Sequence, residues 1–201
     1  MSHKPVVLAS SSAYRRQLLD RLRLPYVAVS PDIDETPRPD DTAAELALRL
    51  AERKAEALAE RYPAHLLIGS DQAAELDGVI IGKPGTLECA TAQLIAAAGR
   101  SVRFHTAVCV MDSESGERAS SAVVTTVEFR ELPPASIAAY LAREPALDCA
   151  GSFKAEALGI ALCRRISGDD PTALIGLPLI ELTRLLASFG VDVLAPSPLP
   201  A

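Results

Sequence analysis

Apolar positions alternate between two spacings through the first half of the chain. Short apolar runs typical of strands occur at Val6–Ala9, Tyr26–Val29, Leu66–Ser70 and Val79–Ile81. Between them, apolar residues recur at helical spacing over Ala13–Leu24, Thr42–Arg61 and Leu87–Ala98. This alternation predicts an α/β fold, in which Leu66, Leu67 and Ile68 form a strand covered on both faces.

The second half of the chain has a different pattern. Val102–Met111 and Ala122–Phe129 are rich in β-branched residues and are separated by the turn-like Asp112–Gly116, which predicts a long antiparallel hairpin and a mixed sheet. We further expect a helix from Pro133 and Pro134 to Arg143, a strand at Ile160–Ile166 and a closing helix at Pro178–Phe189. Residues 1–194 then form one domain, followed by a Pro-rich tail at 195–201 that we expect to be disordered.

Composition narrows the possible partners. The 201 residues are 49% hydrophobic and carry a net charge of −6, which argues against binding to nucleic-acid polymers but permits small phosphate ligands. No apolar stretch approaches the roughly 20 residues needed to cross a bilayer, and Met1–Pro5 lacks the apolar core of a signal peptide, so we expect a cytoplasmic protein. Its four cysteines are widely spaced, which favours reduced, buried thiols.

The junction between the first strand and the first helix carries three hydroxyl residues, Ser10–Ser12. They can cap a helix whose free N–H groups and dipole favour an anion. Arg15 shares a helical face with Leu18 and Leu19, so we expect it to point inward, where a phosphate would satisfy its donors. A capped helix with a structural Arg–carboxylate pair explains this segment equally well.

Two further residues occupy informative positions. Lys54 interrupts the apolar stripe of its helix, four residues from both Leu50 and Leu58; it extends either to the protein surface or into a polar pocket. Asp71 follows the buried strand at 66–70, beyond whose carboxyl end ligands bind in α/β sheets. A turn cap is the alternative role for Asp71.

Two further charged residues, Lys83 and Glu35, are candidates for the same site. Lys83 lies between Gly82 and Pro84, and we expect the proline to hold it more rigidly than a surface lysine. Glu35 belongs to a small acidic group that is either solvated or binds a divalent cation. Cations, carboxylates and a hydroxyl-rich helix start together are the groups that phosphoanhydride hydrolysis requires.

Seven segments together resemble the Maf family of nucleotide pyrophosphatases, in particular its YceF-like branch, which acts on 7-methyl-GTP. In order they are LASSSAYRRQLL from Leu8, DETPR from Asp34, RLAERKA from Arg49, IGSDQ from Ile68, GKP from Gly82, AGSFKAEALGI from Ala150 and GLPL from Gly176. The resemblance spans nearly the whole chain. It implies an inosine-triphosphatase-like α/β fold, with an elongated mixed sheet and helices forming two lobes around a central cleft.

The resemblance also implies an activity, the hydrolysis of a nucleoside triphosphate to its monophosphate and pyrophosphate. By the family pattern, Asp71 accepts a proton from the attacking water and, with Glu35, binds a Mg²⁺ or Mn²⁺ ion. The phosphate-binding positions of the family correspond to Ser10, Arg15, Lys54 and Lys83. A homodimer is a further expectation from the family.

The specificity positions of the family correspond to Tyr14, Gln72 and Glu156. Methylation at N7 makes guanine cationic, so an aromatic face at Tyr14 and a carboxylate at Glu156 would both favour 7-methyl-GTP. The chain departs from the family pattern nearby, at Ala13, Tyr14, Ala157 and Leu158. Two alternatives stay open: the same chemistry on UTP, dTTP or another modified nucleotide, and a regulator of cell division that senses nucleotides without hydrolysing them.

Overall fold

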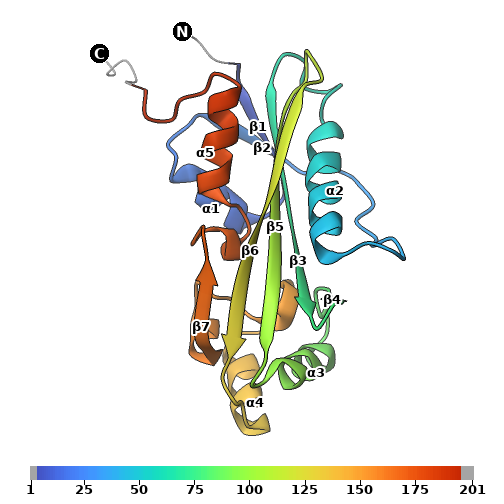
Figure 1. Ribbon diagram of the computed structural model, residues 1–201, viewed down its shortest axis with the longest axis vertical. Coiled ribbons are helices and arrows are strands. Elements are labelled where there is room, and N and C mark those ends of the chain that lie inside the picture. The colour runs from blue at the N-terminus through green and yellow to red at the C-terminus, as the bar shows by residue number, and fades with distance from the viewer. Residues whose placement is uncertain (1–3, 196–201) are drawn as a thin grey trace.

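A single mixed sheet runs the length of the molecule in the computed structural model, which describes residues 4–195 (Figure 1). Its strands are β1 (Val6–Ala9), β2 (Tyr26–Val29), β3 (Leu66–Leu76), β4 (Val79–Ile81), β5 (Ser101–Asp112), β6 (Arg118–Phe129) and β7 (Cys163–Gly168). The strand order is β2-β1-β3-β5-β6-β7, with β4 paired to β3. β2, β1 and β3 pair in parallel and the other pairs are antiparallel, so the predicted mixed sheet is confirmed.

Helices divide the molecule into two lobes that share β3, β5 and β6 (Figure 1). In the first lobe, α1 (Ala13–Asp20) and α5 (Leu179–Ser188) cover one face of the sheet, and α2 (Ala43–Glu56) covers the other. In the second lobe, α3 (Leu87–Ala97) and α4 (Pro134–Arg143) pack on strand residues such as Phe104 and Phe129. The elongated sheet with two lobes that the family resemblance implies is thus confirmed.

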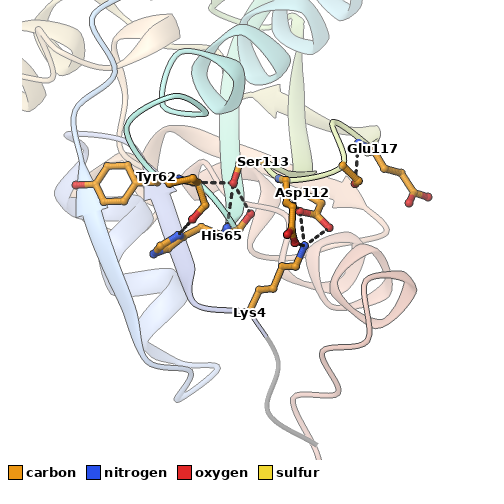
Figure 2. Close-up of polar contacts among 9 residues, drawn as sticks. Lys4, Tyr62, His65, Asp112, Ser113 and Glu117 are labelled. Atoms are coloured by element: carbon orange, nitrogen blue, oxygen red, sulfur yellow. Dashed lines mark hydrogen bonds and ion pairs between the residues drawn. The ribbon is translucent and has the colours of Figure 1, made fainter.

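The far end of the β5–β6 hairpin is tied to the rest of the first lobe by polar contacts (Figure 2). Lys4 donates to both carboxylate oxygens of Asp112, at 2.7 and 2.8 Å. The Ser113 hydroxyl accepts from the His65 amide and donates to the Tyr62 carbonyl oxygen. These contacts attach the hairpin turn to the residues that precede β1 and β3.

Several predicted elements have different bounds in the structure. β3 does not end near Ser70 but continues to Leu76, because its antiparallel partner β5 extends the ladder after parallel β1 ends at Ala9. α1 and α2 end earlier than predicted, at Asp20 and Glu56. The strand predicted from Ile160 starts at Cys163, because a 3₁₀ helix occupies Leu158–Leu162.

The cysteine prediction is wrong in part. All four thiols are free, but only Cys109 is buried, while Cys89 is exposed on α3 and the other two are half-buried. Within residues 4–195, no helix combines the length and apolar character needed to cross a membrane. The predicted Pro-rich tail lies, from residue 196 onward, outside the described residues.

Candidate active site

A cavity of about 670 Å³ lies between the two lobes. Its wall includes the N-terminus of α1, the inner face of α2, the middle of β3 and the segments that follow β4 and α4. All nine residues that the sequence singled out line this one cavity: Ser10, Tyr14, Arg15, Glu35, Lys54, Asp71, Gln72, Lys83 and Glu156. The cavity therefore brings together positions up to 146 residues apart in sequence.

A close helix–strand contact places Lys54 beside Asp71. A Cβ atom at Gly69 would lie only 2.0 Å from the Ala51 carbonyl oxygen, so glycine alone lets α2 approach the backbone of β3 this closely. Lys54 projects from the next turn of α2, and its Nζ donates to Asp71 Oδ1 at 2.6 Å. Lys54 is 4% exposed, so it extends into a polar pocket rather than to the surface.

Asp71 occupies the middle of a strand rather than a turn after one. It lies two residues beyond Gly69, which pairs with Ala9, the last residue of β1. Because β1 and β2 stop here while β3 continues, Asp71 still faces the crevice at the carboxyl ends of the parallel strands. Asp71 thus lines the cavity, although the strand does not end there.

Glu35 forms a cluster of three charged side chains with Lys54 and Asp71. Its Oε1 lies 2.7 Å from Lys54 Nζ, so a single ammonium bridges the two carboxylates. Burial acts to raise the pKa of the Glu35 carboxyl, but the hydrogen bond from Lys54 and the charges of Lys83 and Arg15 outweigh it and hold that pKa below its usual range. Glu35 is therefore ionised at neutral pH.

Arg15 is held by the main chain of a distant loop. Its Nε donates to the Gly176 carbonyl oxygen at 2.8 Å, and the buried Ser70 hydroxyl contacts the same oxygen at 3.0 Å. Burial lowers the pKa of the Arg15 guanidinium, against the opposing charges of Asp71 and Glu35. Since only Nε is used in this bond, the two terminal nitrogens of Arg15 stay available to a ligand in the cavity.

The serines at the start of α1 have the predicted role. Ser12 is the N-cap and accepts from the Arg15 amide, while the Ser10 hydroxyl accepts from the Ser12 amide at 3.1 Å. Residues 10–15 all line the cavity, so the positive end of the helix dipole is directed into it. This arrangement favours an anion at the first-lobe wall.

Lys83 differs from the expectation of a rigidly held side chain. Its neighbour Pro84 is buried and the Gly85 amide donates to the Leu147 carbonyl, so the backbone is fixed. The Lys83 side chain is exposed, however, and the described residues offer it no hydrogen bond or ion pair. It contributes an exposed positive charge to the cavity wall, just beyond the end of β4.

The cavity is electrically asymmetric. Three cations, Arg15, Lys54 and Lys83, surround only two carboxylates at one end. The segment after α4, on the second lobe, contributes the carboxylates of Glu156 and Asp148, and the second of these pairs with Lys154 at 3.7 Å. Phe104, Phe153, Leu174 and Ile81 add apolar surface. Such a cavity suits an elongated ligand with a polyanionic end, an apolar middle and a donor-rich or cationic end.

Gln72 has more partners than its predicted specificity role requires. Its Nε2 lies within 3.1 Å of the Thr106 hydroxyl and of the carbonyl oxygens of Ala173 and Leu174. The amide nitrogen therefore anchors the loop before Gly176, and only its carbonyl oxygen is free for a ligand. Tyr14 and Glu156 line the cavity from opposite lobes, on α1 and on the segment after Phe153.

Sequence reasoning missed several supporting residues. Ser70 and Gly176 position Arg15, and Asp148 and Lys154 lie at the anionic end. The IGSDQ, AGSFKAEALGI and GLPL segments contain three of these residues, so a signal was present. The contacts that hold Arg15 join residues 106 and 161 positions apart, which local spacing does not encode.

Comparisons with known proteins identify the family of this chain. Residues 5–189 match the Maf-like protein family. The chain is 55% identical over 193 residues to a 7-methyl-GTP pyrophosphatase of Bordetella pertussis, and the match covers 96% of each chain. It is 54% identical over 189 residues to a 7-methyl-GTP pyrophosphatase of Pseudomonas fluorescens, and that match covers 94% of this chain and 98% of the relative. A solved nucleoside-triphosphatase / dITP/XTP pyrophosphatase of Mycobacterium abscessus is 17% identical, with a TM-score of 0.47 over 92% of this chain and 96% of that one.

Proposed function

The chain belongs to the Maf family, and we propose that it hydrolyses 7-methyl-GTP to 7-methyl-GMP and pyrophosphate. The observation that carries the proposal is the charge asymmetry of the cavity, which offers a surplus of cations at one end and carboxylates at the other. A triphosphate is a polyanion, and N7-methylguanine is a cationic base with N–H donors on its edge. Relatives at 54–55% identity carry the name of this activity.

The phosphate end supplies the groups for the chemical step. Asp71 is the proton acceptor in our proposal, because it is a carboxylate held in place by Lys54 and turned into the cavity. It takes a proton from a water molecule as that water attacks phosphorus, and the P–O bond to the pyrophosphate leaving group breaks. Arg15, Lys54, Lys83 and Ser10 bind the phosphates and stabilise the charge that develops on them.

The donor set also fits a divalent cation. Lys54 bonds one oxygen of Glu35 and one of Asp71, which leaves a second oxygen of each carboxylate as a possible ligand. Among residues 4–195 no cluster of three or more His, Cys, Asp or Glu side chains could hold a metal by itself. Mg²⁺ commonly takes one or two carboxylates plus substrate phosphates, so Glu35 and Asp71 would hold Mg²⁺ or Mn²⁺ together with the triphosphate. When bound, the ion neutralises phosphate charge.

The opposite end recognises the base in our proposal. The ring of Tyr14 offers a face to a cationic purine, and Glu156 offers a carboxylate to its charge and to its N–H edge. Gln72 contributes its free carbonyl oxygen. We also keep the cytoplasm, where nucleotides are plentiful, and a homodimer as expectations.

Pyrophosphate release from a panel of nucleotides tests the proposal. Purified protein is incubated with 7-methyl-GTP, GTP, ATP, UTP and dTTP, each with Mg²⁺, Mn²⁺ or a chelator. We expect the highest kcat/KM with 7-methyl-GTP, and loss of turnover with the chelator. Higher kcat/KM for UTP or dTTP would retain the chemistry and replace the substrate. Thermal stabilisation by nucleotides without any pyrophosphate release would instead support the sensing role.

A further inference from the structure

The segment from Asp148 to Gly159 carries a lysine that the phosphate chemistry does not use. The segment is anchored by Phe153, whose ring centre lies 5.4 Å from that of Phe104 and 5.3 Å from that of Phe129. Gly151 has a φ of +71°, and a Cβ there would lie 3.1 Å from the Phe104 ring. The backbone that leads to Lys154 is therefore firmly positioned.

The backbone of Lys154 itself is held from two sides. Its amide donates to the Tyr140 hydroxyl of α4 at 3.2 Å. Gly159 packs directly against it, because a Cβ at Gly159 would lie 2.4 Å from the Lys154 carbonyl oxygen. The side chain consequently leaves the second lobe from a fixed point.

That side chain crosses to the first lobe. Lys154 Nζ lies 5.7 Å from the ring centre of Tyr14, within the range of a cation–π contact, and 3.7 Å from Asp148 Oδ1. Only 17% of the side chain is exposed. The pKa of the Lys154 ammonium is raised, first by a side-chain hydrogen bond with Tyr14 and then by the Asp148 charge, so it stays protonated at any physiological pH.

We propose that Lys154 is a positioning residue for base recognition, which acts by holding the ring of Tyr14 against the cavity wall. This inference rests on the proposed function of Tyr14 as the surface that receives the base. An aromatic ring in the first turn of a helix loses rotational freedom when it binds a ligand, and restricting the ring beforehand lowers that cost. Lys154 supplies the restriction from the opposite lobe, while Asp148 limits the positions of its ammonium.

Equilibrium binding of 7-methyl-GMP, measured by calorimetry, tests Lys154 without requiring turnover. We expect Lys154→Met, which keeps the length of the side chain but removes its charge, to raise the Kd about fivefold. Lys154→Arg, which keeps a cation and its donors, should stay within twofold of the wild type. Arg143→Met on the exposed part of α4 removes the same charge elsewhere and should change nothing.

A double-mutant cycle separates positioning of Tyr14 from a structural effect. If Lys154 acts through Tyr14, then Lys154→Met adds no further loss of affinity in a Tyr14→Ala background. In turnover with 7-methyl-GTP, its effect should fall on KM rather than kcat. An unchanged Kd in Lys154→Met, an equal loss in the Tyr14→Ala background, or no binding of 7-methyl-GMP by the wild type would each overturn the inference. Absence of pyrophosphate release by a wild type that still binds 7-methyl-GMP would overturn only the proposed function.

Discussion

The two ends of the cavity are built differently. At the phosphate end, Lys54, Asp71 and Ser10 are each at most 8% exposed and project from a helix, a strand and a strand end that pack closely together. At the base end, Glu156 is exposed and belongs to a turn between two short 3₁₀ helices. The comparison indicates that the proposed chemical step depends on buried, closely packed side chains, while Glu156 can change without disturbing that packing.

The two ends also differ in the free-energy cost of changing one of their charged residues. A buried lysine and a buried aspartate are stable only as a pair, since either charge alone would be strongly destabilising. An exposed glutamate has no such constraint. Substitutions at the phosphate end should therefore lower turnover on every nucleotide, whereas substitutions at the base end should change the ratio between nucleotides.

Removing the proposed proton acceptor should have the largest effect. We expect Asp71→Asn to lower kcat by about 10²–10⁴-fold for every nucleotide, because the amide cannot take up a proton in the attack. The asparagine oxygen can still accept from Lys54, so the melting temperature should change little. Glu75→Gln makes the same chemical change on the same face of β3 but outside the cavity, and should keep wild-type turnover. Retention of more than a tenth of kcat in Asp71→Asn would exclude Asp71 as the base.

A smaller loss of activity is expected when the contact that supports Arg15 is weakened. Ser70→Ala removes a buried hydroxyl that lies 3.0 Å from the Gly176 carbonyl oxygen and 2.8 Å from that of Ala107. Loss of this hydrogen bond, of about 1 kcal/mol, should lower kcat/KM about fivefold. The loss should be equal for 7-methyl-GTP and GTP, because we propose that Arg15 binds the phosphates. Ser120→Ala, which removes a hydrogen bond to Glu52 elsewhere on the sheet, provides the matched control. Unequal losses for the two nucleotides would mean that this loop also contributes to base preference.

A substitution at Glu156 should have the smallest effect, and it should change only the preference between bases. Glu156→Gln neutralises an exposed carboxylate, and we expect the ratio of kcat/KM for 7-methyl-GTP to that for GTP to fall about threefold to tenfold. Turnover of GTP should stay within twofold, because the phosphate end is untouched. Glu60→Gln removes an exposed charge outside the cavity and controls for net charge. A parallel fall for both nucleotides would place Glu156 at the phosphates instead.

Local patterns predicted the α/β class, the hairpin and most strand and helix positions. They succeeded where packing and local propensity agree, as in β1, whose four residues are all buried. They failed at the end of β3, because this strand continues only where β5 is available as a partner. They also failed at the start of β7, where a 3₁₀ helix forms and Gly159 packs tightly on Lys154. Strand ends depend on partners distant in sequence, which a local window does not contain.

For the site, the sequence by itself determined which side chains are present: a lysine on an apolar stripe, an aspartate after a buried strand, and hydroxyls at a helix start. Tertiary structure alone decided that Lys54 bridges Asp71 and Glu35, and that Gly69 permits this approach. It also decided that Arg15 bonds the Gly176 carbonyl oxygen and that Lys154 lies near the Tyr14 ring. The physical reason is the range of the interactions. Periodicity records which face of an element is buried, but a hydrogen bond of about 3 Å exists only once packing has brought two distant segments together.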